Sequence, residues 1–175
     1  MHTFSRILAG ALLLAAPAAF ALDNATATAT ARIYVPITLN KNTDLSFGDI
    51  FADPTGGTVT LDPKSTTRTT GGPALATTGT VSPAAFTVGG KRNASYAITL
   101  PADGTVTLSG PGAAMLVSKF TASVNNGTPT ATPTGLIPNT AGATQTFTVG
   151  ATLTLGANQM DGDYTGTFNV TVAYN

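Results

Sequence analysis

The sequence contains no cysteine, no tryptophan and no glutamate, and its single histidine is His2. Without cysteine the chain can form no disulfide, no thiolate metal site and no cysteine nucleophile. Without a histidine after residue 2, a Ser–His–Asp triad and a histidine metal site are excluded from the rest of the chain. We therefore expect a protein that is not an enzyme and that uses no metal and no cofactor.

Charge is scarce and balanced, with eight Lys and Arg against eight Asp. No basic cluster is longer than Lys91–Arg92, so the chain lacks the positive surface that attracts nucleic acid or an anionic membrane. Asp161 and Asp163, or Asp49 and Asp53, offer the oxygen ligands that calcium prefers. Aspartates beside glycine and proline are also typical of turns, and this is the interpretation that we favour.

Residues 1–21 have the pattern of a secretory signal peptide. Arg6 precedes an apolar run over residues 7–16, and Ala19-Phe20-Ala21 forms a small-x-small cleavage site. The run is too short for a membrane span, and Pro17 interrupts it. We expect a mature chain from Leu22 with no membrane span, exported to the periplasm and then to the cell surface or the medium.

The rest of the chain is rich in threonine, glycine and proline. Threonine and valine suit pleated strands, while glycine and proline mark turns. We expect loops over residues 64–73 and 125–138, a hairpin turn over residues 89–93, and no helix. Short strands at about ten-residue spacing predict an all-β fold, an immunoglobulin-like β-sandwich over residues 32–175 with an N-terminal strand-like extension. The expected strands are residues 32–39, 45–50, 57–61, 79–88, 94–100, 105–109, 115–124, 144–155 and 164–174.

The N-terminal extension, residues 22–31, alternates alanine with threonine and continues the same alternation into the first expected strand. The side chains on its apolar face are Ala25, Ala27, Ala29, Ala31, Ile33 and Val35. Two interpretations are open: a stub that is disordered or extends the first strand, or a donor strand that inserts into a neighbouring subunit. A buried methyl group contributes about 0.8 kcal/mol and a buried Ile or Val about 1.5–3 kcal/mol. The residues from Ile33 onward would therefore supply most of the hydrophobic free energy of strand insertion.

The C-terminal segment alternates in the same way, and its apolar side chains share one face. These side chains are Tyr164, Phe168, Val170, Val172 and Tyr174. The strand ends one residue before the chain, with an aromatic residue in the penultimate position. It is either an ordinary closing strand of the sandwich or an edge that another protein grasps.

These ends resemble the subunits of chaperone–usher pili. Such subunits carry a glycine fourteen residues from the C-terminus, here Gly162, then alternating apolar residues and a penultimate aromatic, here Tyr174. The closing segment is similar to that of spore-coat-U-type pilins of the archaic branch. Over most of the chain the sequence is similar to the bacterial domain-of-unknown-function family 4402. That similarity rests on the closing strand and on three segments, residues 45–48, 95–101 and 149–153.

The pilin resemblance implies an exported structural subunit of a surface fibre, assembled by donor-strand exchange. Ala25 to Val35 would act as the donor, and the edge formed by Gly162, Phe168, Val170, Val172 and Tyr174 would bind the partner. The partners would be a periplasmic chaperone, an outer-membrane usher, and identical or related subunits. The alternative is a self-contained secreted or periplasmic binding module for carbohydrate or matrix adhesion, in which Tyr34 and Phe51 would be tested first.

Overall fold

The computed structural model describes residues 23–175, so the expected signal peptide lies outside the described residues. Within that range all regular elements are β-strands with antiparallel pairing, which confirms the all-β prediction. The same range holds no helix with the length and apolarity that a membrane crossing requires. The strands are β1 (Thr38–Thr43), β2 (Ser46–Phe47), β3 (Gly57–Leu61), β4 (Arg68–Gly71), β5 (Val81–Ser82), β6 (Ala84–Gly89), β7 (Ser95–Thr99), β8 (Val106–Leu108), β9 (Met115–Val124), β10 (Thr134–Leu136), β11 (Thr144–Leu155) and β12 (Thr171–Tyr174).

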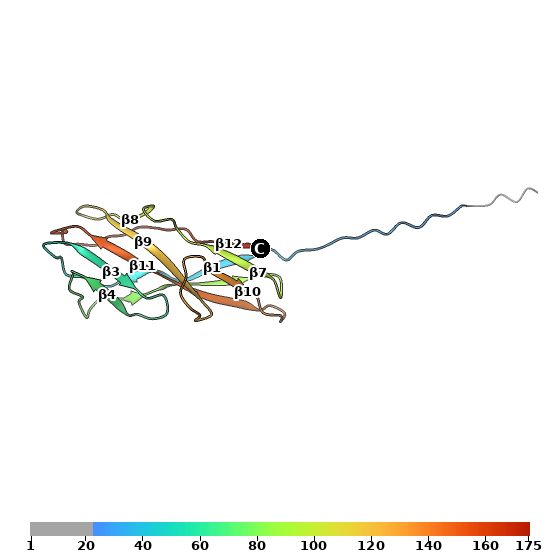
Figure 1. Cartoon of the computed structure of the whole chain (residues 1–175), viewed down its shortest axis with the longest axis horizontal. Helices are drawn as coiled ribbons and strands as arrows, with labels where there is room; N and C mark the ends of the chain where they lie inside the picture. Colours follow the sequence, from blue (N-terminus) through green and yellow to red (C-terminus); the bar gives the residue numbers. More distant parts are fainter. Residues whose placement is uncertain (1–22) are drawn as a thin grey trace, which may run out of the picture. The chain divides into compact units, whose positions relative to one another are not determined.

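The main sheet is organised around β11, the longest strand. The first half of β11 pairs with β6 and its second half pairs with β3, while β9 pairs along its other edge. The sheet continues from β6 to β1, from β3 to β4 and from β9 to β8. A second sheet has the order β10-β7-β12 (Figure 1). In addition, β2 pairs with β5.

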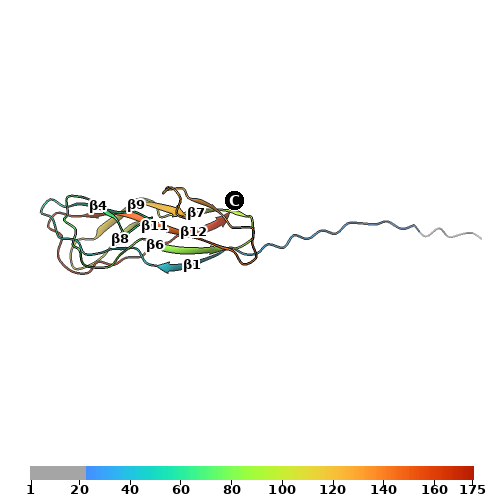
Figure 2. The same cartoon turned by 90° about the horizontal axis from the view of Figure 1, so that it is seen from below.

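The core lies between these layers and is built from alternate residues of the strands. In β6 and β11, which are adjacent, the Phe86 and Phe147 rings stack with centroids 5.0 Å apart. From the second sheet, Tyr96 and Ile98 of β7 join the same buried cluster. Figure 2 shows β12 and β7 in one layer and β6 and β1 in the other. This packing confirms the β-sandwich prediction.

Several local predictions are wrong. Residues 89–93 do not close a hairpin, because β6 and β7 belong to different sheets. Instead, Gly89 and Gly90, followed by Asn93 at φ 55°, carry the chain from one sheet to the other. The expected loops contain strands β4 and β10, in which threonines pair with β3 and β7 despite the glycines and prolines nearby. The first strand begins at Thr38 rather than Arg32, so the segment around Pro36 is not paired.

Tyr96 joins the second sheet to the main sheet through a buried hydroxyl group. Its hydroxyl donates to Oε1 of Gln145 on β11 over 2.7 Å, and the same oxygen accepts from the backbone N–H of Leu136 on β10 over 3.1 Å. Burial disfavours the tyrosinate and raises the pKa of Tyr96 from 10.0 to about 12. The folded state therefore holds this proton more tightly than the unfolded chain does.

We expect the free energy of unfolding to fall as the pH rises from about 10 to about 12, the window between the unfolded and folded pKa values of Tyr96. The contribution is fully present below pH 10, and about 3 kcal/mol is lost at the upper end, at about 1.4 kcal/mol per pKa unit. Urea unfolding across this range measures the loss. The Tyr96→Phe variant carries no proton there, so a slope as steep as that of the wild type would contradict the assignment.

Candidate functional site

The C-terminal segment keeps the predicted alternation, but apart from an antiparallel bridge between Thr165 and Ser109 it is paired only at its end. Its apolar side chains are half-buried against the core, and the residues between them are exposed; the half-buried ones are Phe168, Val170, Val172 and Tyr174. Only Thr171–Tyr174 form a strand, so the prediction of a strand over residues 164–174 is wrong for the first part. There the chain presses against β8, because a Cβ on Gly166 would lie 2.2 Å from the carbonyl oxygen of Thr107.

A tyrosine hydroxyl group forms hydrogen bonds at each end of this segment. We name these two ends the Tyr164 end and the Tyr174 end. At the first, the Tyr164 hydroxyl donates to the carbonyl oxygen of Met160 over 2.9 Å. It accepts from the Gly112 N–H over 2.9 Å and from Nε2 of Gln159, a buried residue, over 2.8 Å. At the other, the Tyr174 hydroxyl accepts from the Lys91 N–H over 2.7 Å and donates to the carbonyl oxygen of Val35 over 2.9 Å.

Removal of the Tyr164 hydroxyl is expected to lower the free energy of unfolding by about 1–3 kcal/mol, because it leaves polar groups around Gln159 without a partner. Tyr164→Phe keeps the ring and isolates this effect, and urea unfolding measures it. Thr167→Ala is the control, because this exposed residue lies outside the strands and should change the stability by less than about 0.5 kcal/mol. Equal stabilities of the two variants would contradict the proposed role of the hydroxyl.

The backbone of β12 is satisfied on one side only. The Asn175 N–H donates to the carbonyl oxygen of Ser95 over 3.2 Å, in register with the β12–β7 ladder. Because bonded and non-bonded pairs alternate in an antiparallel ladder, residues 171 and 173 bond to β7. The N–H and C=O groups of Val172 and Tyr174 then point away from β7. Within residues 23–175 no strand pairs with that edge.

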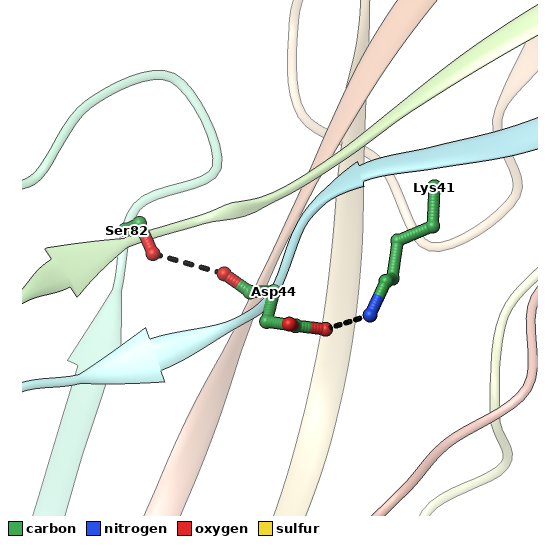
Figure 3. A network of polar contacts seen from close by, with 3 residues as sticks. All are labelled: Lys41, Asp44 and Ser82. Carbon is green, nitrogen blue, oxygen red and sulfur yellow. Dashed lines mark hydrogen bonds and ion pairs between the residues drawn. The ribbon is translucent and has the colours of Figure 1, made fainter.

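Strand β1 is the matching edge of the main sheet, since β6 is its only partner in the described chain. It contacts β12 without pairing with it. Lys41 of β1 forms an ion pair with Asp44, whose carbonyl oxygen accepts from the Ser82 hydroxyl over 2.9 Å (Figure 3). A lysine on an exposed edge strand is a common protection against uncontrolled pairing.

A groove opens where these two edges continue, and we name it the edge groove. One rim consists of residues 45–52, which follow β1, and the other consists of residues 159–166 with Phe168. Its volume is about 800 Å³. The floor is the apolar core itself, formed by Val106 and Leu108 of β8, Met115 and Val117 of β9, and Leu153 and Leu155 of β11. The groove thus reaches down to the core, although Val106, Met115, Val117, Leu153 and Leu155 are themselves buried.

Arg68 holds the first rim in place, a role that sequence reasoning missed. Its guanidinium donates to the carbonyl oxygens of Phe47 and Asp49 over 2.7 and 3.0 Å, and to that of Ala76 over 2.7 Å. Gly48, at φ 68°, brings this rim close to β5, because an added Cβ would lie 2.6 Å from Val81 Cγ2. The only signal in the sequence was a single arginine in a threonine-rich stretch.

The predicted donor residues are exposed and form no strand. Residues 23–33 contain no regular secondary structure, and Ile33 is 92% exposed. Val35 is 53% exposed, and its carbonyl oxygen accepts the bond from Tyr174. Val35 is thus a predicted donor residue that bonds to a predicted C-terminal residue.

The aspartates near the groove are explained by local structure. Asp53 Oδ1 accepts from the N–H of Thr55 over 2.8 Å and also from its hydroxyl, and these bonds lower the pKa of Asp53. Asp161 and Asp163 lie on the rim beside Gly162, whose φ of 130° is accessible mainly to glycine. Within residues 23–175 no three acidic or histidine side chains gather where they could hold a metal ion.

Comparison with known proteins gives one match. No curated protein and no solved structure matches the chain. The family described as Domain of unknown function (DUF4402) matches residues 37–174, nearly all of the sandwich. The chain therefore belongs to the DUF4402 family, as its sequence motifs predict.

Proposed function

We propose that this protein is an exported structural subunit of a bacterial surface fibre, and that its edge groove accepts a strand from another copy. The observation that carries the proposal is the pair of free edges, β1 and β12, beside a groove that opens onto the core. An open edge with apolar residues beneath it is an aggregation hazard unless a partner covers it. A strand added here would pair with the free backbone groups of Val172 and Tyr174 and cover the groove.

The extension supplies a suitable strand. Ala25 to Val35 alternate on one apolar face, and all eleven of these residues are exposed and outside any strand. In strand addition the backbone ladder gives affinity, and pockets for alternate side chains give specificity. The donor residues of one copy would thus complete the sandwich of the next.

Export with an open groove implies that other proteins cover the edge before assembly. A periplasmic chaperone would hold Phe168, Val170, Val172 and Tyr174, and an outer-membrane usher would pass subunits to the cell surface. This proposal rests on the resemblance of the two chain ends to pilin subunits and on the signal-like residues 1–21.

The test is assembly of the purified mature protein. We expect ladders of oligomers on gels run without boiling, because each added strand buries apolar area and forms a full ladder of hydrogen bonds. Deletion of residues 22–31 should leave only monomers, while Lys64→Ala, a change on an exposed loop, should leave the ladders intact. Ladders that survive the deletion would refute the donor assignment.

The second candidate is a self-contained binding module, and two exposed aromatic rings favour it. Tyr34 is 56% exposed and lies beneath the Lys91 ammonium, which is 5.1 Å from the ring centroid, and Phe51 is 59% exposed. Flat exposed rings suit the apolar faces of sugars. Under this alternative, Phe51→Ala abolishes retention on immobilised polysaccharide, and the purified protein stays monomeric whether or not residues 22–31 are present.

A further inference from the structure

A small pocket on the main sheet involves neither of the two free edges. Its volume is about 280 Å³, just below the range of about 300–1,000 Å³ that is usual for ligand pockets. No residue of the N-terminal extension, of β1 or of β12 lines it. We name it the sheet pocket, and its lining residues are Thr60, Leu61, Asp62, Pro63, Thr67, Thr69, Lys119, Thr121, Pro129 and Ala151.

The pocket is formed where the turn between β3 and β4 folds back over the sheet. Thr60 of β3 is paired with Thr152 of β11, and their hydroxyl oxygens are 2.8 Å apart. Beyond this pair the chain lies against Gly150 of β11, which has no side chain. A Cβ added there would be 2.2 Å from the carbonyl oxygen of Leu61 and 2.8 Å from Cδ of Pro63. The turn thus forms one wall of the pocket, and β9 lies on the other side of β11.

A β-bulge in β9 brings a lysine to this pocket in a strained backbone conformation. The β9–β11 register shifts between Gly150 and Thr152, so that Lys119 and Phe120 together face Ala151. Lys119 has φ 52°, and the other non-glycine residues with positive φ in the described chain are all asparagines. Glycine and asparagine tolerate this region, whereas lysine is strained there. Bulges often turn a side chain toward a functional site, and strained residues cluster at such sites.

The lysine is fixed through its backbone, which leaves its ammonium group available. The Lys119 N–H donates to Oδ1 of Asp103 over 2.6 Å. Among residues 23–175, Nζ of Lys119 has no hydrogen-bond or ion-pair partner. Within the same range, the hydroxyl groups of Thr67, Thr69 and Thr121 also form no hydrogen bond with the protein. A ligand in the sheet pocket would therefore meet four polar groups that no protein group occupies.

The lining chemistry suits a neutral, hydroxyl-rich ligand. Hydroxyl groups both donate and accept, an ammonium group only donates, and a carboxylate only accepts. The carboxylate is that of Asp62, whose Oδ1 also accepts from the Lys64 N–H over 2.8 Å. Because Asp62 and Lys119 carry opposite charges, the pocket favours neither an anion nor a cation. The rings of Pro63 and Pro129 add apolar surface for C–H groups. A sugar ring presents both hydroxyl and C–H groups.

We infer that the sheet pocket binds one neutral sugar unit at the end of a polysaccharide chain, with Lys119, Asp62 and Thr121 binding its hydroxyl groups. This inference goes beyond the proposed function and does not depend on it, since the pocket includes no part of either edge. It also differs in place from the second candidate function, because Tyr34 and Phe51 do not line this pocket. In a fibre, one site per subunit would turn weak single-site binding into strong attachment.

Isothermal titration calorimetry of the purified mature protein tests the inference. The probes are glucose, galactose and mannose as neutral sugars, glucuronate as an acidic sugar and glucosamine as a cationic one. We expect a neutral sugar to bind more tightly than both charged sugars. Lys119→Gly should weaken that binding at least about tenfold, because a charged hydrogen-bond donor is lost. Lys64→Gly removes the same charge outside the pocket and should bind like the wild type.

Two further measurements separate sugar binding from a structural role of the lysine. In urea unfolding, Lys119→Gly should have a higher midpoint than the wild type, because glycine relieves the strain at φ 52°. Thr121→Val keeps the shape and the charge of the pocket and should also weaken binding. A gain of stability together with a loss of binding supports the inference, since a purely structural lysine would give the gain alone.

Three results would overturn the inference. These are no binding of any of the five sugars, equal affinities of Lys119→Gly and Lys64→Gly, and tighter binding of a charged sugar than of every neutral one. Loss of binding in Phe51→Ala with full binding in Lys119→Gly would also overturn it and would favour the second candidate function. Because none of these results concerns ladders on unboiled gels, each leaves the proposed fibre function to its own test.

Discussion

Replacement of Val170 by aspartate is expected to abolish assembly while leaving a folded monomer. Val170 is half-buried against the core on the C-terminal segment and lies outside the paired part of β12. In the monomer of the Val170→Asp variant, the new carboxylate would remain partly hydrated. An inserted strand would bury it without a cationic partner, and the effective penalty for a buried ion is several kcal/mol. We expect ladders on unboiled gels to disappear.

The matched control is Asn169→Asp, which adds the same charge at the neighbouring exposed position. This variant should form ladders like the wild type, because its side chain faces away from the core. Circular dichroism and urea unfolding check that both variants are folded. If Val170→Asp assembles as well as Asn169→Asp, the C-terminal segment is not the accepting edge.

Truncation of Phe147 to alanine is expected to lower the free energy of unfolding by about 3–5 kcal/mol, more than any other substitution described above. Phe147 is 1% exposed, stacks on Phe86 and lies in β11 between β6 and β9. The cavity left behind removes contacts with both neighbouring strands. Since domains of this kind are stable by only about 5–15 kcal/mol, a large part of the native stability would be lost.

Urea unfolding of Phe147→Ala and Phe51→Ala gives the comparison. Phe51 is 59% exposed, so its truncation should change the free energy of unfolding by less than about 0.5 kcal/mol. A loss below about 1 kcal/mol for Phe147→Ala would contradict the central position of β11 in the core.

The fold was predictable where alternation and burial agree. Residues 57–61, 115–124 and 144–155 were predicted with the bounds that the strands β3, β9 and β11 have, because their apolar residues face a single core. β4 was missed because most of its residues are exposed, so its sequence lacks the alternating apolar residues that indicate a buried face. The hairpin prediction failed because turn residues at 89–93 show that the chain changes direction but not whether it changes sheet.

The candidate site was predictable in one half only. The alternation from Phe168 to Tyr174 revealed a half-buried segment. In the opposite rim, residues 45–50 were predicted only as one more strand, because the place of this rim beside the C-terminal segment depends on contacts such as those of Arg68. Likewise, the hydroxyl contacts of Tyr164 join residues 52 positions apart in the chain and leave no trace in local periodicity.

Hydrogen exchange at three neighbouring amides of β12 tests strand addition most directly. The N–H groups of Val172 and Tyr174 point to the free edge, while that of Ala173 already bonds to β7. We expect the first two to exchange about a hundredfold more slowly in the assembled mature protein than in the monomer lacking residues 22–31, with little change at Ala173. Equal rates at Val172 and Tyr174 in the two states would contradict strand addition at this edge.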